Sequence, residues 1–213
     1  MTGTIKINPE NPEPGRIDEA VAILKSGGVI AFPTETFYGL GADARNEAAI
    51  DKIFDIKGRD FSNPILVVIG EAGHLDAFAE GIPSSARKLM EKFWPGPLTI
   101  LFSASPSVSP KLTAGSGRIG MRLSSHPIAR ELSKRLGGPL TATSANLSGA
   151  AECSSAAEVI SQLGGKLDGV VDGGYTPGGK GSTIVDVTVS PVKVLREGVL
   201  PSSLIQDTLA IAL

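Results

Sequence analysis

The sequence has 213 residues, and its 20 Lys+Arg against 22 Asp+Glu give a formal net charge of −2, which excludes a globally basic nucleic-acid-coating protein. A chain of this length can fold without a disulfide or a structural metal. Its one cysteine, Cys153, excludes an internal disulfide and indicates a cytoplasmic, reducing location. The chain has only two histidines, His74 and His126. With so few possible ligands and bases, we expect neither a Cys/His zinc site nor a Cys–His nucleophilic pair. No apolar run approaches the roughly 20 residues that span a bilayer, so we expect no membrane contact.

Glycine and proline are the unusual part of the composition. The chain has 26 Gly and 15 Pro, roughly a fifth of its residues against a usual ~12%. Aromatic residues make up only 5%. This composition indicates many tight turns and close backbone approaches.

The predicted elements alternate between helices and strands. In chain order, the apolar pattern predicts a helix at 18–26 capped by Asp18, a strand at 29–32, and a helix at 47–57 between Asn46 and Gly58. A strand at 65–69, a helix at 84–93 capped by Ser84, and strands at 98–103 and 118–123 follow. Then come a helix at 127–136, a strand at 139–143, a helix at 155–163, strands at 169–172, 183–188 and 192–196, and a helix at 202–212.

This alternation predicts an α/β fold in which helices pack on a mixed sheet, as one domain over residues 1–213. The late strands at 169–196 are too close in sequence for helical crossovers, so part of the sheet is expected to be antiparallel.

Polar segments follow two of the predicted strands. FPTETFYGLG (32–41) and TSANLSG (143–149) both come where a buried strand ends, which is where open α/β sheets bind ligands. Their hydroxyl and amide groups suit phosphate or ribose oxygens. Either segment taken alone also fits an ordinary capped turn.

Cationic residues form the second signal. Lys57 and Arg59 flank Gly58 at a helix end, with Ser62-Asn63-Pro64 just beyond, and Arg122 and Arg196 end two strands. An arginine on a buried strand face needs an anion or solvent. Each cation taken alone also fits a helix cap or an edge-strand charge.

The glycine-rich segment 173–183 matches part of the phosphate-binding P-loop motif, because Gly174 and Gly179-Lys180 fit G-x-x-x-x-G-K. Gly181 stands where that motif needs Ser or Thr, and a strand follows instead of a helix, so we reject this interpretation. A flexible loop lying over a ligand remains open, with Ser182 at its exit.

Taken together, the ordered segments resemble the YrdC-like threonylcarbamoyl-AMP synthase family. They are PTETFYGLGADA (33–44), K-G-R with S-N-P (57–64), FWPGPLT (93–99), the run from Arg122 to Arg130, SANLSG (144–149), DGG (172–174), STIVD (182–186) and LREG (195–198). The resemblance covers about residues 14 to 200. It implies an open twisted α/β sheet with a positively charged ligand cavity at the strand ends.

The resemblance implies an adenylyl transfer. L-Threonine and bicarbonate or CO2 give a carbamoyl-threonine, which attacks the α-phosphate of ATP to form threonylcarbamoyl-AMP and pyrophosphate. Partner proteins then transfer the threonylcarbamoyl group to an adenosine of tRNA, with RNA contact as a further expectation. Mg2+ would be carried with ATP, without a protein metal site.

The resemblance also assigns roles to residues of this sequence. The catalytic residues would be Lys57 and Arg59. The nucleotide would be held by Lys57, Arg59, Asn63, Ser144, Asn146 and Arg196. L-Threonine would be held by Thr36, Tyr38, Arg122 and Ser182.

Four positions depart from the family pattern. Val68 stands where histidine is usual, and Thr143 stands where proline is usual. Arg118 replaces a hydroxyl residue near the adenylate, and Glu152 falls in a segment that replaces Ser-Pro-Thr. The segments IGMRLSSHPIA and LREGV resemble a YciO-like branch of the family. That branch tends to lose the PTET, K-x-R and SAN motifs, and all three are intact here.

Two alternatives stay open. One is a paralogue of the same fold that acts on another amino acid or carbamoyl donor. The other is a non-catalytic RNA-binding module that uses the basic residues Lys57, Arg59, Arg118, Arg122, Lys180 and Arg196.

Overall fold

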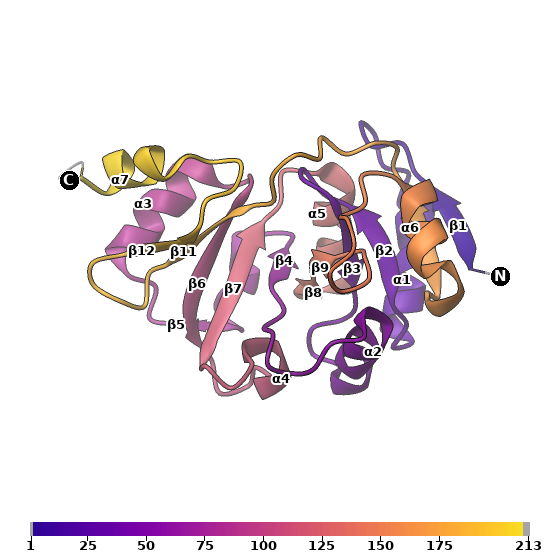
Figure 1. Ribbon diagram of the computed structural model, residues 1–213, viewed down its shortest axis with the longest axis horizontal. Helices are drawn as coiled ribbons and strands as arrows, with labels where there is room; N and C mark the ends of the chain where they lie inside the picture. Colours follow the sequence, from indigo (N-terminus) through magenta and orange to yellow (C-terminus); the bar gives the residue numbers. More distant parts are fainter. Residues whose placement is uncertain (1, 211–213) are drawn as a thin grey trace.

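The computed structural model describes residues 2–210, which form two mixed sheets side by side (Figure 1). The first sheet has the order β1 (Gly3–Lys6), β10 (Gly169–Asp172), β2 (Ile30–Pro33), β3 (Tyr38–Gly41) and β9 (Thr143–Ser144). β1, β10 and β2 are parallel, whereas β2–β3 and β3–β9 are antiparallel. The antiparallel pairing of β3 with β9 places residues 143–144 beside residues 39–40, although the two segments are far apart in the sequence.

The second sheet has the order β12 (Lys193–Arg196), β11 (Thr183–Asp186), β6 (Leu98–Ala104), β7 (Arg118–Leu123), β4 (Val67–Ile69) and β8 (Leu140–Thr141). A short strand, β5 (Ala79–Glu80), pairs with β6. An isolated bridge between Asp43 and Leu140 links the edges of the two sheets. The ends of β3 and β9 therefore lie close to those of β4 and β7 (Figure 1).

Seven α-helices are described between residues 2 and 210. They are α1 (Pro14–Lys25), α2 (Glu47–Lys57), α3 (Ser84–Phe93), α4 (Pro110–Thr113), α5 (Pro127–Leu136), α6 (Ala156–Leu163) and α7 (Ser202–Ala210), and the 3-10 turns are Ala72–His74 and Gly164–Lys166. α1 packs on α5, and α3 packs on α7. None of these helices is long and apolar enough to cross a membrane.

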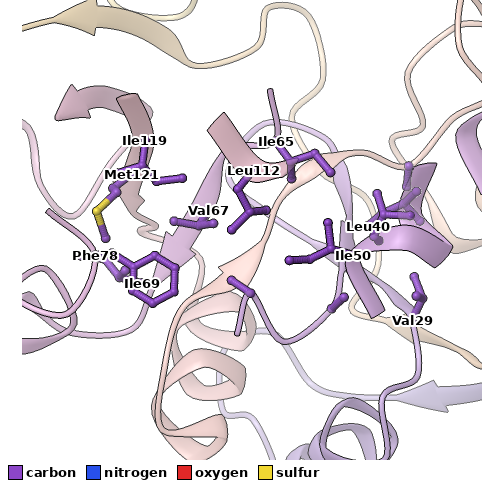
Figure 2. Close-up of a cluster of buried hydrophobic side chains, with 14 of the residues drawn as sticks. Val29, Leu40, Ile50, Ile65, Val67, Ile69, Phe78, Leu112, Ile119 and Met121 are labelled. Atoms are coloured by element: carbon purple, nitrogen blue, oxygen red, sulfur yellow. The ribbon is translucent and has the colours of Figure 1, made fainter. Parts of the chain in front are cut away.

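Two apolar clusters support the sheets. The larger cluster lies under β3, β4 and β7 and includes Leu40, Ile50, Val67 and Met121, as Figure 2 shows. The smaller one joins α1 and α5 to β2 and β10 through residues such as Leu24 and Leu132. Burial on both faces fixes the central strands, and so fixes the loops at their ends.

The local signals at α2 are those that the sequence predicts. Asn46 accepts a hydrogen bond from the Ala49 amide at 3.1 Å, and Gly58 ends the helix with φ of 61° in the left-handed region. Lys57 is therefore the last helical residue, held close to the following loop.

The predicted α/β class is confirmed, and α2, α3, β7 and α5 have the predicted bounds. Where one sheet was expected there are two, and the segment 139–143 is split between β8 and β9. That a single domain spans all of 1–213 stays a prediction, and residues 211–212 of the predicted last helix lie outside the described residues.

Two predicted caps are wrong. α1 begins at Pro14 after Glu13, so Asp18 lies inside the helix, and α3 follows Pro83, so Ser84 is its first residue. Pro14 fixes φ near its helical value at the first position of α1, and neither helix has a hydrogen bond from a capping side chain.

Candidate functional site

A cavity of about 290 Å3 lies where the strand ends of the two sheets meet. Seven of the predicted site residues line it: Thr36, Tyr38, Arg59, Arg122, Ser144, Ser182 and Arg196. One wall is apolar and includes Leu66, Val68 and Ile184. A concave site with an apolar wall and a few convergent polar groups is typical of a small-molecule pocket.

Lys57 lies behind this cavity and is absent from its lining. Its buried Nζ donates to the Ser144 carbonyl at 2.6 Å, the Asn146 carbonyl at 3.0 Å and Asn146 Oδ1 at 3.2 Å. The Lys57 carbonyl in turn accepts from the Ser148 amide at 3.2 Å. Lys57 therefore ties the end of α2 to the turn that carries Ser144.

Burial is the main reason that the pKa of Lys57 falls from its ordinary value to about 8. The neighbouring charge of Arg59 lowers this pKa further, whereas Glu152 and Cys153 oppose the shift. The group is still mainly an ammonium at neutral pH, so it can serve all three carbonyl acceptors.

Asn146 also supports the turn from outside the cavity lining. Its Oδ1 accepts from Ser144 Oγ at 2.7 Å, and its Nδ2 donates to the Ala150 carbonyl at 2.6 Å. The side chain thus braces the loop from both sides and leaves Ser144 at the cavity.

Arg59 reaches the cavity from the loop after α2. Its Nη2 is 3.3 Å from the Pro64 carbonyl, and its guanidinium lies 5.6 Å from the centre of the Phe54 ring. The Nε atom is buried and has no hydrogen-bond partner within residues 2–210. Burial lowers the pKa of Arg59 from its ordinary value, with Asp60 opposing this shift. A cation with an unused buried donor favours binding of an anion.

Asn63 does not reach the cavity. It is exposed, and its Nδ2 lies 3.5 Å from Asp60 Oδ1 and 3.4 Å from Ser62 Oγ. Its predicted contact with the nucleotide would require this loop to move.

Arg196 and Ser182 enter the cavity as a pair. Arg196 donates from Nε and Nη2 to the Ser182 carbonyl, at 3.1 and 2.8 Å, and from Nη2 to Ser182 Oγ at 3.2 Å. Thr99 Oγ1 lies 2.9 Å from Ser182 Oγ and also lines the cavity. Thr99 has no role predicted from the sequence, although it lies in the FWPGPLT segment that carries part of the resemblance.

Close backbone packing makes room for this pair. A Cβ atom on Gly198 would lie 2.0 Å from the Gly181 carbonyl oxygen, and one on Gly181 would lie 3.1 Å from Arg196 Nη2. Only glycine allows the two segments to approach this closely.

Arg122 and Thr36 also line the cavity. Arg122 is buried at the end of β7, and its Nη1 lies 3.5 Å from Thr36 Oγ1. The Gly178 amide donates to the Thr36 carbonyl at 2.9 Å. The hydroxyl of Tyr38 donates to the Gly174 carbonyl at 2.7 Å, so Tyr38 anchors the glycine-rich loop as well as lining the cavity.

The cavity is cationic. Arg59, Arg122 and Arg196 face a single lining carboxylate, that of Glu152. Burial lowers the pKa of Arg196 from its ordinary value, and Arg122 adds to this shift while Glu152 opposes it. Such an arrangement binds polyanions by charge and by hydroxyl donors. In the described part of the chain, His, Cys, Asp and Glu side chains form no group of three or more that could hold a metal ion.

Of the four residues that depart from the family pattern, three line the cavity and one lies outside it. Val68, Thr143 and Glu152 line the cavity. Arg118 does not, because its Nη1 pairs with Asp186 at 2.7 Å farther along the sheet.

A sequence model of the Sua5/YciO/YrdC family, described as "Telomere recombination", matches residues 22–198. The chain belongs to this family. It is 39% identical over 196 residues to threonylcarbamoyl-AMP synthase of Bacillus subtilis. This alignment covers 92% of the present chain and 56% of the Bacillus protein. The chain thus spans a little over half the length of this relative.

Solved structures agree with this placement. The Pyrococcus abyssi Sua5 protein complexed with L-threonine has a TM-score of 0.95 and 38% identity, covering 98% of this chain and 61% of that one. E. coli YciO has a TM-score of 0.86 and 31% identity, covering 94% of this chain and 98% of that one. The predicted family resemblance and fold are therefore confirmed.

Proposed function

We propose that this protein is a threonylcarbamoyl-AMP synthase, a nucleotidyltransferase that uses L-threonine, bicarbonate and ATP. The observation that carries the proposal is that three arginines, Arg59, Arg122 and Arg196, converge with hydroxyl groups on one cavity. Relatives with this name and a threonine-bound structure of the same fold support it. The product would feed threonylcarbamoyl transfer to tRNA by partner proteins, which makes RNA contact and a cytosolic location parts of the proposal.

The proposed reaction has two steps. The amine of L-threonine attacks CO2 derived from bicarbonate and loses a proton, which gives an N-carboxylate. An oxygen of this carboxylate then attacks the α-phosphorus of ATP, and the bond to the β-phosphate oxygen breaks as pyrophosphate leaves. Attack and departure in line need positioning and charge stabilisation more than a protein nucleophile.

The residues of the cavity divide between the two substrates. Arg122, Thr36 and Ser182 would hold the threonine, because a guanidinium binds a carboxylate in two parallel hydrogen bonds. Arg59, Ser144 and Arg196 would hold the phosphates and stabilise the charge that develops on them. Mg2+ would enter as part of the Mg–ATP substrate, bound by phosphate oxygens.

Lys57 and Asn146 would act by holding Ser144 in place, and Tyr38 by anchoring the 173–181 loop. Asn63 would join the nucleotide only if its loop closes on the cavity.

The direct test is pyrophosphate release by the purified chain with Mg–ATP and bicarbonate. We expect release that depends on L-threonine, and loss of release in Arg59→Ala with the fold retained. Folded protein that releases no threonine-dependent pyrophosphate would refute the proposal.

A second candidate is a paralogue that acts on another amino acid. The observation that favours it is Glu152, a carboxylate that lines the cavity among the arginines and departs from the family pattern. A thermal-shift screen of amino acids in the presence of ATP separates the two, since selective stabilisation by an amino acid other than threonine would support the paralogue.

A further inference from the structure

A buried carboxylate stands behind Arg122. Glu35 Oε1 lies 3.4 Å from Arg122 Nη1, and the two side chains are only 11% and 8% exposed. This oxygen has no hydrogen-bond partner within the described residues. Arg122 is therefore its main compensation for burial.

The other oxygen of the Glu35 carboxylate is fixed by Ser124. The hydroxyl of Ser124 hydrogen-bonds to Glu35 Oε2, and Ser124 Oγ accepts from the His126 amide at 3.1 Å. Ser124 is fully buried, so its one proton needs an acceptor, and Glu35 Oε2 provides it. This pattern requires Glu35 Oε2 to be the acceptor of the Ser124 proton.

The neighbouring imidazole does not compete with Arg122 for this charge. Burial lowers the pKa of His126 from its ordinary value, with Glu35 opposing the shift, so the ring is neutral at pH 7. Arg122 is thus the cation that faces Glu35.

Glu35 itself is absent from the cavity lining, whereas Arg122 and Thr36 form part of it. In the described part of the chain, the ion pair of Arg122 with Glu35 and its hydrogen bond to Thr36 both involve Nη1. The Nε and Nη2 edge of the guanidinium is thereby left for a ligand. A guanidinium held by one corner presents a defined edge for a planar, two-point contact with a carboxylate.

We propose that Glu35 is a positioning residue that aims Arg122 at the carboxylate of the amino-acid substrate. Ser124 completes the device by fixing the Glu35 side chain. This inference rests on the proposed function, because it assumes that the ligand of Arg122 is an amino acid.

The test compares L-threonine binding by wild type and Glu35→Gln by calorimetry, and the KM for threonine and for ATP in turnover. Glutamine keeps the size of the side chain but removes the charge that holds Nη1. We expect threonine affinity to fall at least tenfold and the KM for threonine to rise, with the KM for ATP within twofold of wild type. Glu35→Asp, which restores the charge, should recover part of the affinity.

The matched control is Glu131→Gln, the same change at an exposed ion pair with Lys134 on α5, which should leave both KM values unchanged. If Glu35→Gln does not fold, Ser124→Ala serves instead, because it keeps both charges and frees one carboxylate oxygen. We expect a threefold or greater loss of threonine affinity in that variant.

The outcomes are distinct. If wild type binds threonine and the threonine affinity of folded Glu35→Gln is within twofold of it, the proposed role of Glu35 is overturned. The proposed function would still stand in that case. Wild type that binds no threonine would overturn both.

Discussion

Replacing Lys57 with methionine should abolish most activity while changing stability little. The ammonium of Lys57 is shared by three oxygens of the turn at 144–146. Methionine fills a similar volume and provides no donor. The change therefore removes the tie between α2 and the turn without opening a large cavity.

The expected stability change is the difference of two opposing effects. Ser144 O keeps a hydrogen bond from the Asn146 amide at 3.0 Å, and Asn146 Oδ1 keeps one from Ser144 Oγ, so the Asn146 carbonyl is the group that loses its partner. Leaving one buried carbonyl unpaired costs about 1–3 kcal/mol. The fall in the pKa of Lys57 from 10.5 to about 8 means that burying its charge costs up to about 3 kcal/mol, which methionine relieves.

We therefore expect the free energy of unfolding to change by less than about 2 kcal/mol, a Tm shift of about 4–8 °C at most for a chain of this size. Activity should fall far more. A displacement of about 1 Å of a positioning group can cost roughly 100-fold in rate, so kcat/KM for pyrophosphate release should fall by about that factor.

The assay pairs a thermal melt with steady-state pyrophosphate release. Lys52→Met is the control, because Lys52 is on the same helix and donates to the Gly27 carbonyl at 2.7 Å, away from the cavity. It should retain wild-type turnover. A folded Lys57→Met protein that keeps more than a third of wild-type kcat/KM would refute the positioning role.

The other predictions concern pH, the glycine-rich loop and the tight backbone crossing. Because Lys57 has a lower pKa folded than unfolded, the unfolded state binds more protons between pH 8 and 10.5, so wild type should gain up to about 3 kcal/mol of unfolding free energy relative to Lys57→Met across that window. Tyr38→Phe should cost about 1–2 kcal/mol and speed proteolysis within 173–181, because it removes the hydroxyl that anchors this loop. Gly198→Ala should prevent stable folding or lower the Tm sharply, because its Cβ would lie 2.0 Å from the Gly181 oxygen.

Each of these measurements has a control within the chain. The pH series needs parallel denaturant melts of both proteins, and parallel curves from pH 7 to 10.5 would contradict the burial argument. Tyr175 is 86% exposed, so Tyr175→Phe should not alter proteolytic cleavage of the loop. Equal effects of the two tyrosine variants would refute the role of the Tyr38 hydroxyl as an anchor of the loop. Gly15→Ala has open space at the start of α1 and should stabilise by up to about 1 kcal/mol.

The sequence predicts local features well where the signal lies within a few residues. The bounds of α2 follow from Asn46 and Gly58, and those of α5 follow from Pro127 and Gly137. The same logic identifies the polar strand ends, because Arg122 and Ser182 stand directly beside apolar strands. These are the residues that the structure brings to the cavity.

The sequence predicts contacts between distant segments poorly. β3 has the composition of a turn, YGLG, and is a strand because it pairs with β2 and β9. Lys57 meets the 144–146 turn across 87 residues, and Glu35 meets Ser124 across 89. No local pattern reveals such partners, so a residue that acts through another cannot be told from one that touches a ligand.

The proposed function requires this cavity to join threonine, bicarbonate and ATP into one adenylate. The most direct measurement is mass spectrometry of the products formed by wild type with 13C-bicarbonate, Mg–ATP and L-threonine. We predict a threonylcarbamoyl-AMP that carries one 13C atom, formed only when all three substrates are present. Folded protein that yields no labelled adenylate, or yields it with another amino acid in place of threonine, would contradict the proposed function.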